Sequence, residues 1–347
     1  MVFNGTSRNR SETRWSDDYY FLQEKGYVLR PRYHPDWTAS WLGTNHNKNH
    51  CEDSVIPNLP HILDATQEST GGTVCIKWIR EAYTENERAI CEYLRSPQLS
   101  LDPTNHCVPV IEFIPDPSII GACYLVMPLL RPFNDPEFIV IGEVVEFIQQ
   151  IIDGLQFMHK HGVAHRDCVG ANIMMDATTM YPNGWHSIRR NLSPDLTDAA
   201  HHCDRIDADV KYFFIDFGIS ARFLPGQQRI ITDLRGREQR PPELVAGIPH
   251  NPFKLDMAII GYLLDDNFYK IYADLHFLSP LINALKADDP ARRPTAEEAL
   301  AAWNTIRRVV DQAKYYSRLR KHRETLSEAL LNSSVHAFKG VKRLVAS

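Results

Sequence analysis

The sequence predicts an α+β fold in two lobes, with a small sheet-rich lobe that carries one helix and a larger, mainly helical lobe after it. Two observations predict this fold. Short apolar runs separated by Gly, Pro and polar turns characterise residues 61–130, whereas apolar residues recur at three- and four-residue steps from Gly142 onward. The apolar period therefore changes along the chain, and a Pro-containing stretch at residues 128–133 marks the expected hinge.

The first lobe is expected to span residues 21–127 and to begin with an atypical extension. Residues 1–20 before it are polar and rich in Arg and Ser, so we expect a disordered tail. Residues 27–60 carry clusters of Trp and Pro, which indicate ordered loops with a short strand.

The sheet of the first lobe is predicted from four apolar runs. Residues 61–66 and 73–79 flank a polar, Gly-containing link and predict a β-hairpin. A short helix is expected at residues 84–95. Two more strands follow at residues 108–114 and 123–130.

The second lobe is expected to span residues 128–310. An amphipathic helix starts near Gly142 and ends at Gly162, since glycine commonly terminates helices. Short strands at 173–175 and 210–215 follow, with a polar insert at about 177–209 that we expect on the surface of this lobe, and then mostly helical patterns over residues 254–331. The remaining residues, 311–347, form a basic tail with helical character; we favour an exposed extension over a membrane-surface or partner helix.

Composition limits the possible functions. The net charge of −5 gives no sign of nucleic-acid binding, and the seven scattered cysteines indicate reduced thiols in a cytoplasmic or nuclear protein. The first residues lack the apolar core of a signal peptide, and the longest apolar runs fall short of a bilayer span. We therefore expect a soluble protein without a transmembrane segment.

Three short motifs occur in a fixed order on the predicted elements. Lys77 lies in the second strand of the hairpin, His165-Arg166-Asp167 is followed by Asn172, and Asp216-Phe217-Gly218 ends an apolar strand. Phosphoryl transfer needs such a set: a cation for the phosphates, two oxygen ligands for Mg²⁺ and a carboxylate that receives the hydroxyl proton. Each triplet alone occurs by chance, but their ordered combination favours one interpretation.

With these motifs, residues 60–305 resemble a eukaryotic protein kinase. The two expected lobes likewise resemble a bilobal protein-kinase-like fold. The resemblance implies ATP and Mg²⁺ as cofactors and a protein substrate. It makes Asp167 the catalytic base, Asn172 and Asp216 the magnesium ligands, and Lys77 the residue that holds the ATP phosphates. The insert, with the motifs RPRYHPDW, SWLGT and MYPNGWHS, is similar to a divergent kinase-like group from mushroom-forming fungi.

The resemblance also assigns residues around the adenine. The strand CYLVMPLL resembles the strand that enters a kinase hinge, which makes Met127 the gatekeeper and turns the backbone of Pro128 and Leu130 toward the base. Met174 belongs to the same implied ATP-binding set. Gly43 is the nearest candidate for a phosphate loop.

A second set of matches is implied to brace the larger lobe. Glu243 resembles the glutamate that closes a kinase activation segment, and Arg293 the arginine that pairs with it. Asp256 resembles the aspartate of a central kinase helix. Because this set characterises kinases that act on proteins, it favours a protein substrate.

The partner of Lys77 follows from helical periodicity. From Glu87, steps of three, four and seven lead to apolar residues, so Glu87 is expected on the inward face of its helix. A carboxylate there needs a cation, and we favour Lys77. A capping box that includes Thr84 and Glu87 is the alternative.

The sequence departs from the kinase pattern at several positions. No GxGxxG precedes Lys77, Val169 stands where serine/threonine kinases carry a lysine, and Ala171 where tyrosine kinases carry an arginine. Arg237 stands where kinases often place a threonine. Arg166 is able to bind a phosphate on Thr232, although a segment arranged without phosphorylation is at least as consistent with the sequence.

We therefore expect a protein kinase that transfers the γ-phosphoryl group of ATP to a protein hydroxyl, with Ser or Thr favoured over Tyr. A pseudokinase that serves as a binding or scaffolding module is the first alternative, motivated by the missing glycine loop. A small-molecule kinase is the second alternative.

Overall fold

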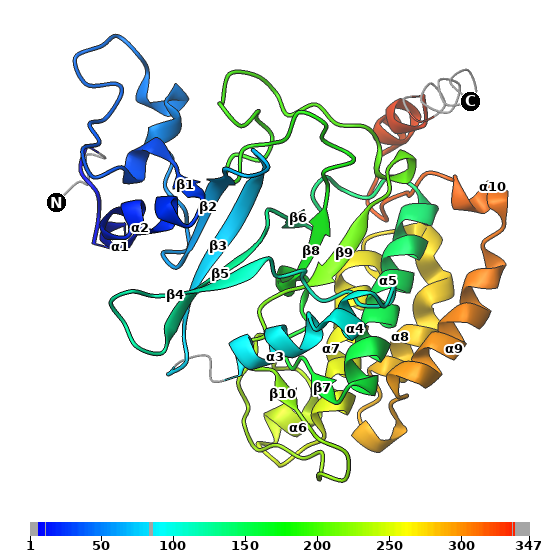
Figure 1. Ribbon diagram of the computed structural model, residues 1–347. Helices are drawn as coiled ribbons and strands as arrows, with labels where there is room; N and C mark the ends of the chain where they lie inside the picture. Colours follow the sequence, from blue (N-terminus) through cyan, green and yellow to red (C-terminus); the bar gives the residue numbers. More distant parts are fainter. Residues whose placement is uncertain (1–5, 11, 83–85, 335, 337–347) are drawn as a thin grey trace. The chain divides into compact units, whose positions relative to one another are not determined.

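The computed structural model describes residues 6–10, 12–82, 86–334 and 336, and these form a mixed α/β structure of two compact units (Figure 1). The described residues of the first unit come from Met1–Cys91, Val108–Arg131 and Asp176–Val210. Those of the second unit come from Glu92–Cys107, Pro132–Met175 and Lys211–Ser347.

A five-stranded antiparallel sheet forms the centre of the first unit, in the order β1-β2-β3-β5-β4. Its strands are β1 (Tyr27–Leu29), β2 (Ile62–Gln67), β3 (Thr73–Arg80), β4 (Glu112–Pro115) and β5 (Ala122–Pro128). The expected hairpin is confirmed as β2 and β3, because alternating burial along both strands turns one face of the hairpin into the core. The two later strands are also confirmed, although β4 begins at Glu112 rather than at residue 108.

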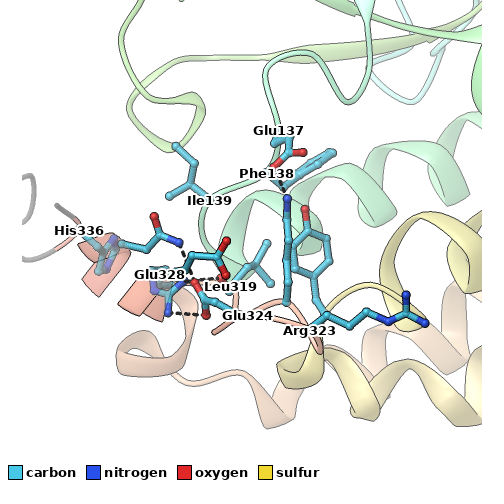
Figure 2. A pocket seen from close by; sticks show the side chains of 12 residues that line it. Glu137, Phe138, Ile139, Leu319, Arg323, Glu324, Glu328 and His336 are labelled. Carbon is cyan, nitrogen blue, oxygen red and sulfur yellow. Dashed lines mark hydrogen bonds and ion pairs between the residues drawn. The ribbon is translucent and has the colours of Figure 1, made fainter. Parts of the chain in front are cut away.

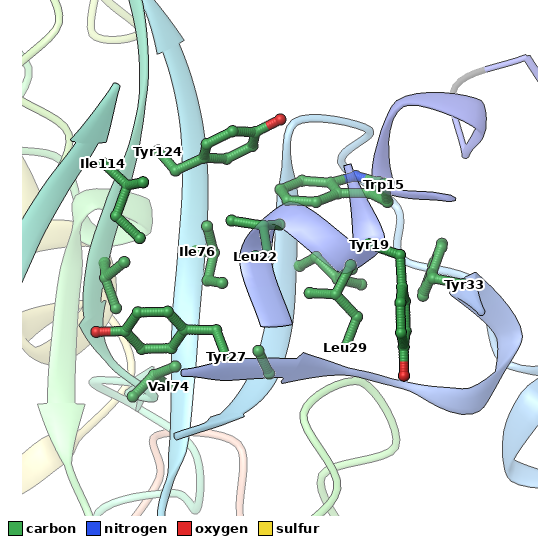
Figure 3. Close-up of a cluster of buried hydrophobic side chains, with 13 residues drawn as sticks. Trp15, Tyr19, Leu22, Tyr27, Leu29, Tyr33, Val74, Ile76, Ile114 and Tyr124 are labelled. Atoms are coloured by element: carbon green, nitrogen blue, oxygen red, sulfur yellow. The ribbon is translucent and has the colours of Figure 1, made fainter. Parts of the chain in front are cut away.

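The N-terminal residues are more ordered than their composition suggested. Residues 13–24 form α1 (Thr13–Asp17) and α2 (Tyr19–Glu24), whereas we expected disorder up to residue 20. The reason is apolar burial: Trp15 and Leu22 pack in a cluster with Tyr27 and with side chains of the sheet (Figure 3). Burial of large aromatic and aliphatic side chains offsets the entropy of ordering this short segment.

Buried charge fixes the extension that follows β1. Arg32 is 1% exposed and forms an ion pair with Glu12, and its guanidinium also donates to the carbonyl oxygen of Asp53 at 2.9 Å. The Asp53 carboxylate in turn accepts from Trp37 Nε1 at 2.8 Å and from Ser40 Oγ at 2.7 Å. These contacts explain how the predicted loops of residues 27–60 are ordered with only one short strand.

The polar insert belongs to the first unit. Residues 176–210 cluster with the N-terminal residues, whereas the sequence led us to place an insert at 177–209 on the larger lobe. Arg189 donates to the carbonyl oxygen of Asn49, and Arg131 stacks on the rings of Tyr181 and Trp185, at 4.4 and 5.3 Å from their centroids. A hydrogen bond therefore joins the insert to the extension, and Arg131 packs against the aromatic rings of the insert.

The second unit is mainly helical. Its helices pack as the pairs α5 with α9, α7 with α8 and α8 with α9 (Figure 1). They are α4 (Pro97–Ser100), α5 (Ile141–Lys160), α6 (Pro242–Val245), α7 (Pro252–Leu264), α8 (Ser279–Leu285), α9 (Ala296–Ile306) and α10 (Gln312–Tyr315). The chain enters this unit within α3 (Glu87–Leu94), where the short helix was expected.

Helix α5 is the predicted amphipathic helix, and its apolar positions are buried along one face. It ends before Gly162, which has a φ of +73°. A Cβ at this position would lie 2.2 Å from the carbonyl oxygen of Phe223, so both the backbone conformation and the space require glycine.

Short strands carry the loops of the second unit. They are β7 (Val163–Ala164), β8 (Ile173–Asp176), β9 (Lys211–Phe214) and β10 (Ala221–Arg222), and β6 (Arg131–Pro132) lies where the chain passes from the first unit to the second. Strands β6, β8 and β9 form one small sheet in that order, and β10 pairs with β7. The predicted strands at 173–175 and 210–215 are thereby confirmed as β8 and β9.

All seven cysteines lie in the described residues, and none forms a disulfide. Over the same residues, no helix combines the length and the apolarity that crossing a membrane requires.

Candidate functional site

The motif His165-Arg166-Asp167 and Asn172 lie on one short loop, residues 165–172, between β7 and β8. The Nδ2 group of Asn172 donates to the main-chain oxygen of Asp167 and to its carboxylate Oδ2, both at 2.9 Å. Both residues are buried, at 7% and 2% exposure. The five-residue spacing thus closes a small ring that fixes both side chains.

Asp216 lies where the chain leaves β9, beside this loop. The N–H of Ile215, the residue before it, donates to the carbonyl oxygen of Asn172 at 3.0 Å. The carbonyl oxygen of Ile215 contacts His165 Nε2 at 3.0 Å. Asp216 therefore follows directly on a residue that is bonded to the loop of Asp167 and Asn172, and it is partly accessible to solvent.

The backbone at these positions is strained. Among the described residues, three that are not glycine have positive φ, and two of them are Arg166, at 70°, and Asp216, at 65°. A residue with a Cβ adopts this left-handed conformation at a cost of about 1–3 kcal/mol, and such strain concentrates at functional sites. The strain falls on two of the three predicted motifs.

Asp256 supports the loop of residues 165–172 through its carboxylate. It is fully buried on α7, and its carboxylate accepts from the main-chain N–H groups of His165 at 2.8 Å and Arg166 at 2.6 Å. His159 Nε2 lies 3.0 Å from the same carboxylate. The predicted bracing residue thus acts on the loop itself, because two otherwise unpaired donors at the strained turn find their acceptor there.

His165 packs against Phe217 of the Asp216-Phe217-Gly218 motif. Its ring lies 5.0 Å from that of Phe217, and both side chains are buried. Burial lowers the pKa of His165, opposed by the nearby Asp256 carboxylate, so the ring is neutral near pH 7. The two buried rings therefore contribute to the packing beneath the loop.

Arg166 is bound by protein groups. Its guanidinium donates to the carbonyl oxygen of Ile219 at 2.5 Å and forms an ion pair with Asp233 at 2.7 Å. Partial burial opposes ionisation of Asp233, but hydrogen bonds from Arg235 and Arg166 hold its pKa well below the ordinary value. Sequence reasoning considered Thr232 and missed Asp233, although an acidic residue next to the candidate threonine was a usable signal.

Lys77 and Glu87 form a buried ion pair in the first unit. Lys77 Nζ on β3 lies 2.5 Å from Glu87 Oε1 on the first turn of α3, and their side chains are 9% and 1% exposed. This is the partner that helical periodicity favoured. Thr84, which the capping-box alternative requires, lies outside the described residues.

The residues assigned to adenine lie on two short elements. Met127 and Pro128 end β5, where they pair with Cys75 and Val74 of β3, and Met127 and the following Leu130 are buried. Met174 lies on β8, where it is partly exposed between two buried neighbours. Gly43 has a φ of +71° in an exposed turn, and no other atom would lie within 4 Å of a Cβ there.

Glu243 and Arg293 form the second predicted ion pair. The guanidinium donates to both carboxylate oxygens, at 2.5 and 2.8 Å, and to the carbonyl oxygens of Ala287 and Lys254. Both side chains are 1% exposed. The pair joins α6 to the turn that precedes α9.

Two cavities lie elsewhere. One of about 520 Å³ in the second unit is lined by residues 137–139 and by the C-terminal segment, where Glu324 accepts from Arg318 at 2.7 and 2.9 Å (Figure 2). The other, of about 770 Å³, lies in the first unit against β1 and the insert, and His186 lines it. None of the predicted catalytic, ATP-binding or metal residues lines either cavity.

The described residues contain no cluster of three or more His, Cys, Asp or Glu side chains suited to a metal ion. No family model matches the chain, and no curated protein matches it either.

Proposed function

We propose that the chain is a protein kinase with a bilobal kinase-like fold, which transfers the γ-phosphoryl group of ATP to a serine or threonine hydroxyl in preference to a tyrosine hydroxyl. One observation carries the proposal. Asp167 and Asn172 are joined by hydrogen bonds on a strained loop, and the residue before Asp216 is bonded to Asn172. A carboxylate base beside two oxygen donors suits phosphoryl transfer.

In this reaction Asp167 receives the proton of the attacking hydroxyl. A bond forms between the hydroxyl oxygen and the γ-phosphorus, and the bond from that phosphorus to the β-phosphate oxygen breaks to release ADP. Asn172 supports the base, because its Nδ2 donates to Asp167 Oδ2 at 2.9 Å and so fixes the carboxylate. Phe217 and Asp256 keep the loop in this arrangement through His165.

The donor set fits magnesium. Because Nδ2 of Asn172 is committed to Asp167, its Oδ1 is the amide atom left for a cation, and Asp216 adds a partly accessible carboxylate. Mg²⁺ is commonly held by one or two protein oxygens together with nucleotide phosphates, which agrees with the absence of a larger cluster among the described residues. When bound, the metal neutralises charge on the phosphates.

Lys77 would bind the ATP phosphates, with Glu87 holding its ammonium in place at 2.5 Å. The adenine would lie against Met127, Met174 and the backbone of Pro128 and Leu130. The carbonyl oxygen of Pro128 can accept from the adenine amino group although Pro128 has no N–H.

The ion pair between Arg166 and Asp233 supports a segment arranged without phosphorylation. In the proposed kinase, residues 216–243 are the activation segment, and Arg166 is the residue that would bind a phosphate on it. The carboxylate of Asp233 lies there instead, at 2.7 Å. Asp233 is therefore proposed to serve in place of a phosphorylated Thr232.

A pseudokinase that binds or scaffolds partners is the second candidate, and the first unit gives the reason. Glycines that cradle phosphates normally join the first two strands of a kinase, but here residues 30–61 join β1 to β2, and Gly43 lies in an exposed turn. A small-molecule kinase is less favoured, because the ion pair between Glu243 and Arg293 resembles that of kinases with protein substrates.

Two measurements separate these functions. The first is transfer of a labelled γ-phosphate to a mixed protein substrate, and the second is the shift in melting temperature that Mg-ATP induces. The wild type should transfer label and melt higher with Mg-ATP. Asp216→Asn should lose both effects. Asp274→Asn, which removes a carboxylate paired with Arg320 at 2.6 Å in the same unit, should keep both. A wild type that transfers no label to protein would overturn the proposal and leave the scaffold.

A further inference from the structure

The segment after Asp233 runs directly against the loop that carries Asp167. Gly236 has a φ of +139°, and a Cβ at this position would lie 3.2 Å from the carbonyl oxygen of Arg166 and 3.7 Å from Asp167 Oδ1. A residue with a Cβ at position 236 would need a backbone conformation that only glycine adopts readily. Gly236 therefore allows a close approach of the segment to the proposed base.

This approach brings Arg237 to Asp167. The main-chain N–H of Arg237 donates to Asp167 Oδ1 at 2.7 Å, and its side-chain Nε lies 3.8 Å from Oδ2. The Arg237 side chain is 56% exposed, whereas that of Asp167 is 10% exposed. The backbone thus anchors Arg237 on the base, while more than half of its side chain is exposed to solvent.

The basic groups of the loop itself, residues 165–172, are engaged or uncharged. Arg166 is buried, and it donates to Ile219 and Asp233. His165 is neutral near pH 7, because burial lowers its pKa. Val169 and Ala171 bring no charge to the loop. Arg237, in contrast, pairs with Asp167 and reaches solvent.

We propose that Arg237 is a catalytic residue, whose guanidinium binds the γ-phosphoryl oxygens during transfer and supplies from the activation segment the positive charge that the loop lacks. Negative charge spreads over these oxygens in the transition state. A planar guanidinium offers several donors to two of them at once. The inference rests on the proposed function, since it concerns the same reaction and the same base.

The test compares four proteins: the wild type, Arg237→Ala, Val169→Lys and the double variant. With γ-labelled ATP and one protein substrate, kcat of Arg237→Ala should fall about 10²-fold, as for the loss of one donor to a transition-state oxyanion, while KM for ATP changes less than threefold. Adding Val169→Lys to Arg237→Ala should raise kcat at least tenfold above that of Arg237→Ala, because it places a cation on the loop. Val169→Lys alone should change kcat little.

Arg229→Ala is the matched control. Arg229 is an exposed arginine of the same segment that lies over the Phe253 ring, 4.7 Å from its centroid. Its removal should leave kcat within twofold of the wild type. The melting temperature of Arg237→Ala should also stay close to that of the wild type, since the backbone hydrogen bond to Asp167 remains.

The inference is overturned if Arg237→Ala keeps or raises kcat, or if adding Val169→Lys to Arg237→Ala does not raise kcat. A rise would mean that Arg237 restrains the base. If the wild type transfers no label, the proposed function itself fails. This outcome is distinct from failure of the inference about Arg237, which requires an active wild type.

Discussion

Each unit contains a buried ion pair between a basic residue and a glutamate, and the two pairs have different surroundings. Lys77 and Glu87 approach to 2.5 Å, and so do Arg293 and Glu243. Arg293 is 1% exposed, binds both carboxylate oxygens and donates to two carbonyl groups as well. Lys77 keeps 9% of its side chain exposed on β3.

This difference teaches that burial and distance do not by themselves assign a role. A fully enclosed, two-pronged arginine pair braces the fold. A lysine at the end of a flexible chain, paired with a carboxylate, is suited to hold a ligand. Replacing both partners of a pair separates the roles, because matched apolar side chains often recover the stability of a buried pair but not its function.

The largest expected effect is on the Lys77 pair. Lys77→Met should lower phosphoryl transfer about a thousandfold, and should also lower stability because Glu87 is left buried without its cation. Adding Glu87→Leu should recover most of the melting temperature and none of the transfer rate. Label transfer and thermal unfolding, measured on the same samples, check this; recovered activity in the double variant would assign the pair to structure alone.

The Arg293 pair should behave in the opposite way. Arg293→Met should destabilise the protein by about 3–5 kcal/mol, since a carboxylate remains buried and unpaired. Arg293→Met with Glu243→Leu should regain only part of this, because the carbonyl oxygens of Ala287 and Lys254 still lose their donor. Chemical denaturation measures the stability, and the folded double variant should keep its transfer rate within several-fold.

A third buried pair extends the comparison to the N-terminal extension. Arg32 and Glu12 resemble the Arg293 pair, since Arg32 is 1% exposed and also donates to Asp53. Glu12→Gln should therefore cost about 2 kcal/mol of stability, the value of a hydrogen bond to a charged group, with no loss of transfer rate. A loss of activity at unchanged stability would give this extension a functional role.

The smallest effect concerns the more exposed pair of Arg166 and Asp233. Because the folded-state pKa of Asp233 is depressed, its contribution is present above the ordinary value of 3.8 and is lost as the pH falls through the folded-state pKa. Asp233→Asn should lower stability by about 1 kcal/mol or less at pH 7. The difference in melting temperature should persist at pH 5–7 and shrink below about pH 4.

The contrast between the pairs also marks what the sequence was able to predict. The hairpin of β2 and β3, helix α5 and the pairing of Glu87 follow from apolar periods of two and 3.6, because those periods decide which side chains are buried. The hydrogen bonds between Asp167 and Asn172 join residues only five positions apart, whereas the place of Asp216, 44 positions after Asn172, was expected from the resemblance.

The remaining features depend on contacts between distant residues. Trp15 orders a polar tail by packing near Tyr124, whose ring centroid lies 5.8 Å away, and no local pattern reveals this. The insert is held in the first unit by Arg131 and Arg189, which gave no signal in the sequence. The approach of Arg237 to Asp167 requires the backbone conformation of Gly236, which composition does not encode.

The single-turnover rate of γ-phosphoryl transfer by Asp167→Asn, at saturating Mg-ATP and protein substrate, tests the central claim most directly. The rate should fall about a thousandfold, because the base is lost, while the affinity for Mg-ATP stays unchanged. A rate within tenfold of the wild type would contradict Asp167 as the group that receives the hydroxyl proton.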